Sequence, residues 1–182
     1  MKYEFSKFSP FDLNLYQINI TEWKDNKKHI LSLVDFSNES ASSKFETLTY
    51  SDYYMNNSYK IRYSKSLMDM LNPYLKEFSD KVYQFQKILG PWCQKQLSGD
   101  YHATHDHGSV GYSAVFYASL DNKVHDSTLF YSPLQGLNGM REDPRSITVS
   151  EGDLIIFPAN LLHMAPAHQS EKERTIISFN LL

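Results

Sequence analysis

The sequence predicts a mainly β fold, a sandwich or jelly-roll barrel preceded by helices. From residue 112 onward, short runs of β-branched or aromatic residues alternate with turn residues, a spacing typical of such folds. These runs are 112–120, 128–132, 146–149, 154–157 and 175–181. Between residues 64 and 89, in contrast, apolar residues recur at helical intervals. The aromatic fraction of 14%, with 13 Tyr, also favours strands.

The first part of the chain is predicted to form strands and a helix that support this core. Residues 11–20 alternate loosely and indicate one or two strands. Thr21 is expected to cap a short helix. The apolar face of this helix would consist of Trp23, Ile30, Leu31 and Val34. Residues 37–43 and 136–144 are rich in Ser, Asn, Gly or Asp and predict loops.

Two helices are predicted between residues 64 and 89. The first covers 64–71, and Asn72 followed by Pro73 resembles an N-cap that restarts the helix. The apolar stripe of the second comprises Leu75, Phe78, Val82, Phe85 and Leu89. Gly90 and Pro91 are expected to end it. Packing on the outside of a sheet is favoured over binding of a partner helix.

The composition indicates one soluble globular domain. Of 182 residues, 41% are apolar and 21% charged, which fits a single domain with a real core. The order of the helical and strand patterns predicts helical or mixed support in 1–91 and a β core in 92–182. The net charge of −3 shows no clear nucleic-acid signature. Cys93 is the single cysteine and is expected to be a buried thiol. The absence of a leader-like or membrane-spanning apolar run predicts a cytoplasmic protein.

The segment 99–111 carries the most specific chemical pattern. In a strand, His105 and His107 would face the same side. Together with His163, which follows a later strand, they would present three imidazoles to one metal. Such a set occupies one face of an octahedral ion and leaves three positions open. The alternative is that these histidines lie in the core or on the surface without meeting.

Two neighbours of this pair are expected to point away from it. His102 and Asp106 would lie on the opposite face of the strand and form local hydrogen bonds. Asp106 would reach a metal only if the strand were bulged at that point.

Arg174 begins the last predicted strand and shares a face with Ile176 and Ser178. If this face lines the barrel interior, the guanidinium requires an anionic partner, and a carboxylate matches its fork of donors. The alternative is an arginine at the end of the barrel with its charge in water.

Three stretches of the C-terminal half resemble a known superfamily: Gly99–Tyr117, Glu151–His163 and Glu173–Asn180. They are similar to the double-stranded β-helix core of Fe(II)- and 2-oxoglutarate-dependent oxygenases. The small prolyl-4-hydroxylase-like proteins of bacteria and tailed phages are the nearest type. A phage origin would place the protein in the host cytoplasm.

The resemblance implies an oxidoreductase. It would be a dioxygenase that hydroxylates its substrate while 2-oxoglutarate is decarboxylated to succinate. His105 and His163 would bind Fe(II), and Arg174 and Ser178 would hold the distal carboxylate of 2-oxoglutarate. His107 stands where most of the superfamily has Asp or Glu, so an all-His site carries one negative charge fewer.

Two alternatives remain from the sequence alone. The spacing from Gly99 to His107, and from Gly152 to His163, also resembles the cupin motifs, which would imply a metal dioxygenase or isomerase that does not use 2-oxoglutarate. Against it, no Glu follows His107 closely, and Arg174 has no role in a cupin. The other alternative is a non-catalytic jelly-roll binding module.

The substrate stays open among a peptide, a nucleobase and a small metabolite. Its expected contacts are Tyr112, Tyr117, Tyr131 and the segment 136–144.

Overall fold

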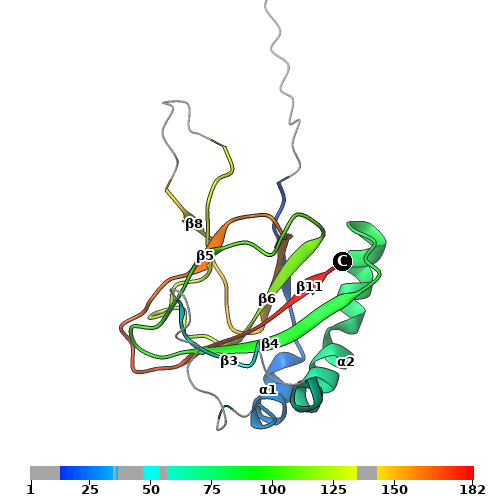
Figure 1. Ribbon diagram of the computed structural model, residues 1–182. Coiled ribbons are helices and arrows are strands. Elements are labelled where there is room, and N and C mark those ends of the chain that lie inside the picture. Colours follow the sequence, from blue (N-terminus) through cyan, green and yellow to red (C-terminus); the bar gives the residue numbers. More distant parts are fainter. Residues whose placement is uncertain (1–12, 35, 37–46, 54–56, 135–142) are drawn as a thin grey trace, which may run out of the picture.

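Two antiparallel sheets face each other, and two helices cover the outer face of the larger sheet (Figure 1). The computed structural model describes residues 13–34, 36, 47–53, 57–134 and 143–182. In chain order the elements are β1 (Tyr16–Asn19), α1 (Trp23–Ser32), β2 (Thr47–Leu48), β3 (Tyr50–Ser51), α2 (Asn57–Lys81), β4 (Ile88–Gln96), β5 (Tyr101–His105), β6 (Tyr112–Ser119), β7 (Leu129–Phe130), β8 (Arg145–Ser146), β9 (Asp153–Pro158), β10 (His163–Ala165) and β11 (Arg174–Leu181).

The larger sheet has the order β1-β9-β6-β11-β4-β3, and the smaller has the order β2-β5-β10-β7-β8. All of these pairings are antiparallel. Most neighbours in space are not consecutive in sequence, as in a jelly roll. Strands β1 and β3 of the first half extend the larger sheet, and β2 extends the smaller one.

The predicted strands 112–120, 154–157 and 175–181 are confirmed as β6, β9 and β11, to within one residue at each end. The predicted strand 128–132 is shortened to the two-residue strand β7. The prediction 146–149 is wrong apart from Ser146, because β8 covers only residues 145 and 146. Strands β4 and β10 were not predicted. The predicted loops 37–43 and 136–144 lie outside the described residues, apart from 143 and 144.

The central strands of the larger sheet are buried on both faces. In β6, Ala114 and Phe116 pack toward the helices, whereas Val115 and Tyr117 pack toward the smaller sheet. Strands β9 and β11 divide their side chains in the same way. Because successive side chains alternate in direction, a strand between two layers carries apolar residues on both of its faces. The space between the sheets therefore receives every second residue of these strands.

Helix α1 is anchored to the sheet by its first residue. The Trp23 indole donates a hydrogen bond to the Ala118 carbonyl at 3.1 Å and packs edge-on against Phe116. The prediction that Thr21 caps this helix is wrong, since Glu22 is the N-cap residue and no side chain caps it. Burial of the tryptophan sets where the helix begins.

Helix α2 is continuous, so the prediction of two helices with a restart at Pro73 is wrong. A proline inside a helix costs about 3 kcal/mol through its missing N–H and a steric clash. The apolar residues that α2 buries on both sides of the proline are Leu67, Leu71, Leu75 and Phe78. Each contributes roughly 1.5–3 kcal/mol by burial. Their packing on one sheet outweighs the local penalty.

The helical stripe also ends earlier than predicted. Helix α2 stops at Lys81, Val82 is exposed, and Leu89 already belongs to β4. Gly90 has a φ of +107° and precedes a cis peptide bond to Pro91 within β4. Because helical and strand periods cannot be distinguished over a few apolar residues, the boundary was misplaced.

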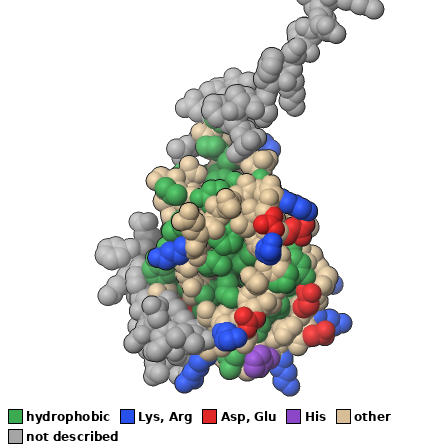
Figure 2. All heavy atoms as spheres, turned by 90° about the vertical axis from the view of Figure 1, so that its right-hand side faces the viewer, with side chains coloured by type: hydrophobic (Ala, Val, Ile, Leu, Met, Phe, Trp, Pro, Cys, Tyr) green, Lys and Arg blue, Asp and Glu red, His purple; other side chains and the backbone are tan. Residues whose placement is uncertain are grey.

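Figure 2 looks onto the side of α2, where basic and acidic side chains are interspersed around hydrophobic ones. Charges of opposite sign pair along the helix at i,i+4, as in Lys65 with Asp69 and Lys76 with Asp80. This face therefore offers no extended surface of one sign. Within the described part of the chain, no helix is long and apolar enough to cross a membrane.

A buried carboxylate joins α2 to β4. Asp52 accepts a hydrogen bond from the Tyr63 hydroxyl at 2.6 Å and another from the Cys93 backbone N–H at 2.7 Å. All three residues are fully buried. Cys93 is the buried thiol that the sequence predicts, and burial raises its pKa.

Replacing Tyr63 with Phe should lower the free energy of unfolding by about 1.5–3 kcal/mol, because a buried carboxylate loses a hydrogen bond. Urea denaturation would measure the change. Tyr74→Phe is the matched control, since it removes a solvent-exposed hydrogen bond to Glu22 from the same helix. An equal decrease in the free energy of unfolding in both variants would contradict a structural role for the buried Tyr63–Asp52 pair.

Candidate active site

Three histidines converge between the two sheets. In the pairing of β10 with β5, His163 lies directly opposite His105, and their ring centroids are 4.3 Å apart. Strand β5 ends at His105, so His107 follows the strand rather than lying in it. A hydrogen bond of 2.8 Å from its N–H to the Ala159 carbonyl still holds His107 beside His163. One potential ligand atom from each of the three rings lies within 4.8 Å of the others.

Backbone carbonyls orient two of these rings. The Nδ1 atom of His105 is 2.7 Å from the Ala103 oxygen, and the Nδ1 of His163 is 2.8 Å from the Leu161 oxygen. A carbonyl only accepts hydrogen bonds, so Nδ1 carries the proton in both rings. The lone pair of each Nε2 atom is then free to bind a metal.

Burial keeps the three rings neutral. It lowers the pKa of His163 to about 3 and that of His107 to about 4, and it also lowers the pKa of His105. Near pH 7 each imidazole therefore offers a lone pair. Imidazole nitrogens suit divalent first-row transition metals, including iron, so the donor set fits the metal that the sequence resemblance implies.

Asp106 points away from the triad, as the sequence predicts. It is exposed, and its Oδ1 accepts a hydrogen bond of 3.0 Å from the Gly108 backbone N–H. Among the described residues that line the cavity beside the triad, none carries a carboxylate.

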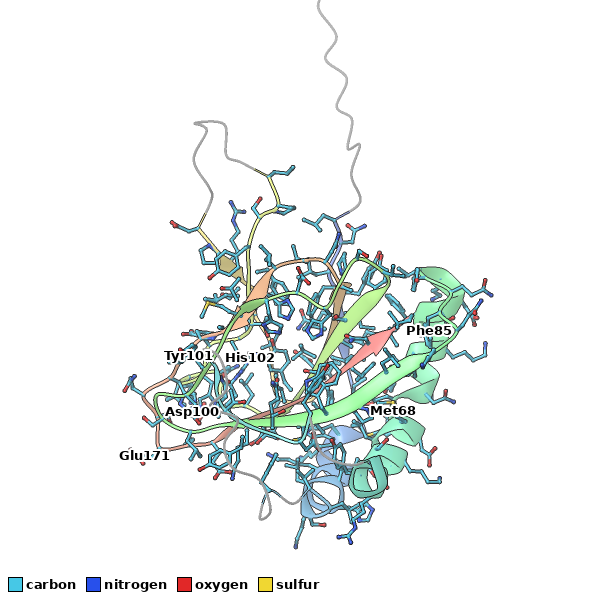
Figure 3. All side chains as sticks on the ribbon, in the orientation of Figure 1. Met68, Phe85, Asp100, Tyr101, His102 and Glu171 are labelled. Carbon is cyan, nitrogen blue, oxygen red and sulfur yellow. The ribbon has the colours of Figure 1, made fainter. Side chains whose placement is uncertain are left out.

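The prediction that His102 faces away is wrong. The pair His163–His105 is followed by the pair Ala165–His102, so three steps along β5 match two along β10. This β-bulge rotates the strand and places His102 on the same side as His105. His102 lines the same cavity as His105, and Figure 3 shows it beside Tyr101, across the molecule from Met68 of α2. Burial lowers the pKa of His102 to about 3.

Arg174 is buried at the other end of this interior. Its side chain is 1% exposed, which excludes the alternative of a charge in water. Nη1 donates a hydrogen bond to the Gln96 Oε1, and the guanidinium lies over the Tyr117 ring, 5.7 Å from its centroid. Among the described residues, Nε and Nη2 have no hydrogen-bond partner. Buried unpaired donors on a cation are costly unless an anion meets them. Two free N–H groups of one guanidinium fit a carboxylate.

A small cavity lies beside the triad. Its lining residues are Trp92, Gln94, His102, His105, His107, Val115, Thr128, His163, Ala165, Ile176 and Ser178. Ser178 thus shares the interior face of β11 with Arg174, as predicted. The volume is about 20 Å³, roughly the space of one water molecule.

Sequence reasoning missed the polar face of β4, on which Gln94 and Gln96 point toward the interior. The signal was present, because two glutamines at i and i+2 share one face of a strand. They were overlooked because β4 was not predicted.

Two of the three tyrosines expected at the substrate are elsewhere. Tyr112 packs against Phe78 and Tyr83 on the helical side of the larger sheet. Tyr117 is the one that lies in the interior between the sheets, where it is fully buried and its hydroxyl donates to the hydroxyl of Thr128, a residue lining the cavity, at 2.9 Å. Tyr131 lies on the face of the smaller sheet that points away from the triad, where its hydroxyl contacts the sulfur of Met164 and accepts a hydrogen bond from the Thr104 hydroxyl at 3.2 Å.

Solved structures similar to this chain support the jelly-roll architecture. A prolyl-4-hydroxylase from Pseudomonas putida matches with a TM-score of 0.66 at 9% identity, covering 93% of this chain and 92% of that one. HygX from Streptomyces hygroscopicus, solved with nickel, 2-oxoglutarate and hygromycin B, matches at 0.61 with 16% identity and covers 93% and 83%. A Trichoplax adhaerens prolyl hydroxylase, in complex with a hypoxia-inducible factor peptide, matches at 0.59 with 10% identity and covers 94% and 84%.

These likenesses confirm the fold as a double-stranded β-helix with helices on its outer face. No curated protein sequence matches the chain. The sequence model of a family described as "Putative 2OG-Fe(II) oxygenase" matches residues 90–180, the segment from β4 to β11 that contains all three histidines and Arg174. The metal and cosubstrate of that family are Fe(II) and 2-oxoglutarate, and the chain belongs to this family of oxygenases.

Proposed function

We propose that the protein is a hydroxylating dioxygenase in which His105, His107 and His163 hold Fe(II). In the same proposal Arg174 and Ser178 bind the distal carboxylate of 2-oxoglutarate. The observation that supports it is that both groups lie in the same space between the two sheets. Three neutral imidazoles converge at one end, and a buried guanidinium with two unpaired nitrogens lies at the other.

Bound Fe(II) would supply the activation of O2 that is coupled to the oxidation of 2-oxoglutarate to succinate and CO2. The residues of the chain provide position and exclusion of water. The free Nε2 atoms of His105 and His163 are directed by their Nδ1 hydrogen bonds. Arg174 supplies a positive charge whose attraction to a carboxylate is strong because water is excluded there.

Two of the similar structures are prolyl hydroxylases, one of them with a bound peptide, and a third contains hygromycin B. Exposed apolar side chains lie next to the triad in sequence, with Leu162 before His163 and Val110 shortly after His107. Tyr53 is also exposed and packs on Trp92, which stacks on His107. Exposed apolar residues of this kind favour an uncharged substrate group, on a peptide or a small molecule, over a polyanion.

Replacing His163 with Ala should weaken divalent metal binding by about 100-fold or more. Loss of a group that only supports a metal ligand already costs about 10- to 100-fold in affinity, and loss of the ligand itself costs more. His107→Asp should bind the metal more tightly than wild type, since it restores a negative charge to the site. Anaerobic competition of Fe(II) against a chromophoric chelator would measure both. His29→Ala, at an exposed histidine of α1, is the control. Unchanged affinity in His163→Ala would contradict the proposed site.

Anaerobic Fe(II)-loaded protein should develop a weak visible charge-transfer band on titration with 2-oxoglutarate. Arg174→Ala should weaken this binding by about 100-fold, because a buried charge pair is lost. Arg62→Ala, at an exposed arginine of α2, should bind as wild type does. Iron bound without any band would instead favour a cupin-type metal enzyme that does not use 2-oxoglutarate.

A further inference from the structure

Each ring of the triad packs against another flat ring, and the three contacts differ in centroid distance and interplanar angle. They are His102 on His105 (4.0 Å, 18°), Trp92 on His107 (5.6 Å, 29°) and Phe157 on His163 (4.7 Å, 68°). The first is the closest and the most nearly parallel, and both of its rings belong to β5.

The bulge in β5 creates this contact. In a regular strand, residues three positions apart point to opposite faces, so His102 and His105 would not meet. With the extra residue of the bulge, both rings lie in the interior. Bulges of this kind redirect side chains next to active sites.

A hydrogen bond to the opposite sheet fixes the His102 ring. Its Nδ1 atom lies 3.1 Å from the Gln94 Nε2, which belongs to β4 of the larger sheet. An amide nitrogen only donates, so the His102 Nδ1 accepts and the ring is neutral. The ring is thus held by β5 at its backbone and by β4 at its edge.

His105 needs such a support more than His163 does. It is the last residue of β5 and is only half-buried, whereas His163 is 4% exposed and is enclosed by Phe157 and Phe130. One hydrogen bond, to Ala103, sets its tautomer but allows the ring to pivot about that contact. A parallel ring at 4.0 Å blocks this rotation.

We propose that His102 is a positioning residue for the metal ligand His105, held in place by Gln94 and acting through the stacked face of its ring. The inference rests on the proposed function, because it assumes that the triad binds a metal. Its role differs from that of a ligand, since the cluster of potential ligand atoms contains His105, His107 and His163 without His102. The flat ring is the required feature, and the hydrogen bond of its Nδ1 atom to Gln94 is an additional anchor.

Co(II) is a suitable probe, because its affinity can be measured by chelator competition and its visible bands respond to ligand geometry. We expect His102→Ala to weaken Co(II) binding by about 10-fold and to shift the bands. His102→Phe should restore affinity to within about threefold of wild type, because the ring face returns. Thr104→Ala, on the opposite and exposed face of β5, is the matched control and should behave as wild type. Thermal unfolding of each metal-free variant would separate loss of the fold from loss of the site.

Wild-type affinity and spectrum in a folded His102→Ala protein would overturn the role of His102 while leaving the triad intact. A folded His102→Phe variant as weak as His102→Ala would also overturn it, because stacking alone would then not suffice. Failure of the wild-type protein to bind Co(II) or Fe(II) would instead overturn the three-histidine site, and the role of His102 with it.

Discussion

The register between β5 and β10 is the constraint on which the site depends. It places His105 directly opposite His163, so that two rings from segments far apart in sequence meet on one face. A slip of one residue would turn one of the two rings out of the interior. Strand β10 spans only three residues, so its own ladder is a weak determinant of register. The hydrogen bond from the His107 N–H to the Ala159 carbonyl adds a second attachment near the same point.

The interior between the sheets contains two kinds of buried titratable group, one neutral and the other charged. The histidines are neutral, because burial lowers their pKa values well below 7. Arg174 has no such option, since burial lowers the pKa of a guanidinium that starts far above neutrality. It therefore remains a cation with donors that no described residue pairs. This region is less favourable for stability than an apolar core would be, and the anion of the proposed function would offset that cost.

The charges around this interior are compatible with a proposed metal site that consists of histidines alone. With Asp106 turned outward and no carboxylate among the described lining residues, a divalent metal would keep its full charge. A dianionic cosubstrate would then be attracted by the metal at one end and by Arg174 at the other. In the proposed site, the missing negative charge would weaken the hold of the protein on the metal but would strengthen the field that acts on an anionic ligand.

Sequence patterns by themselves determined the mainly β class, the positions of β6, β9 and β11, the three histidines and the shared face of Arg174 and Ser178. These features follow from strand alternation and local spacing, which a single segment carries. The tertiary structure alone decided the unbroken course of α2 through Pro73 and the start of β4 before Gly90. It also decided the inward turn of His102. Each of these depends on packing or pairing with a distant segment, whose free energy outweighs the local preference and leaves no mark in the local sequence.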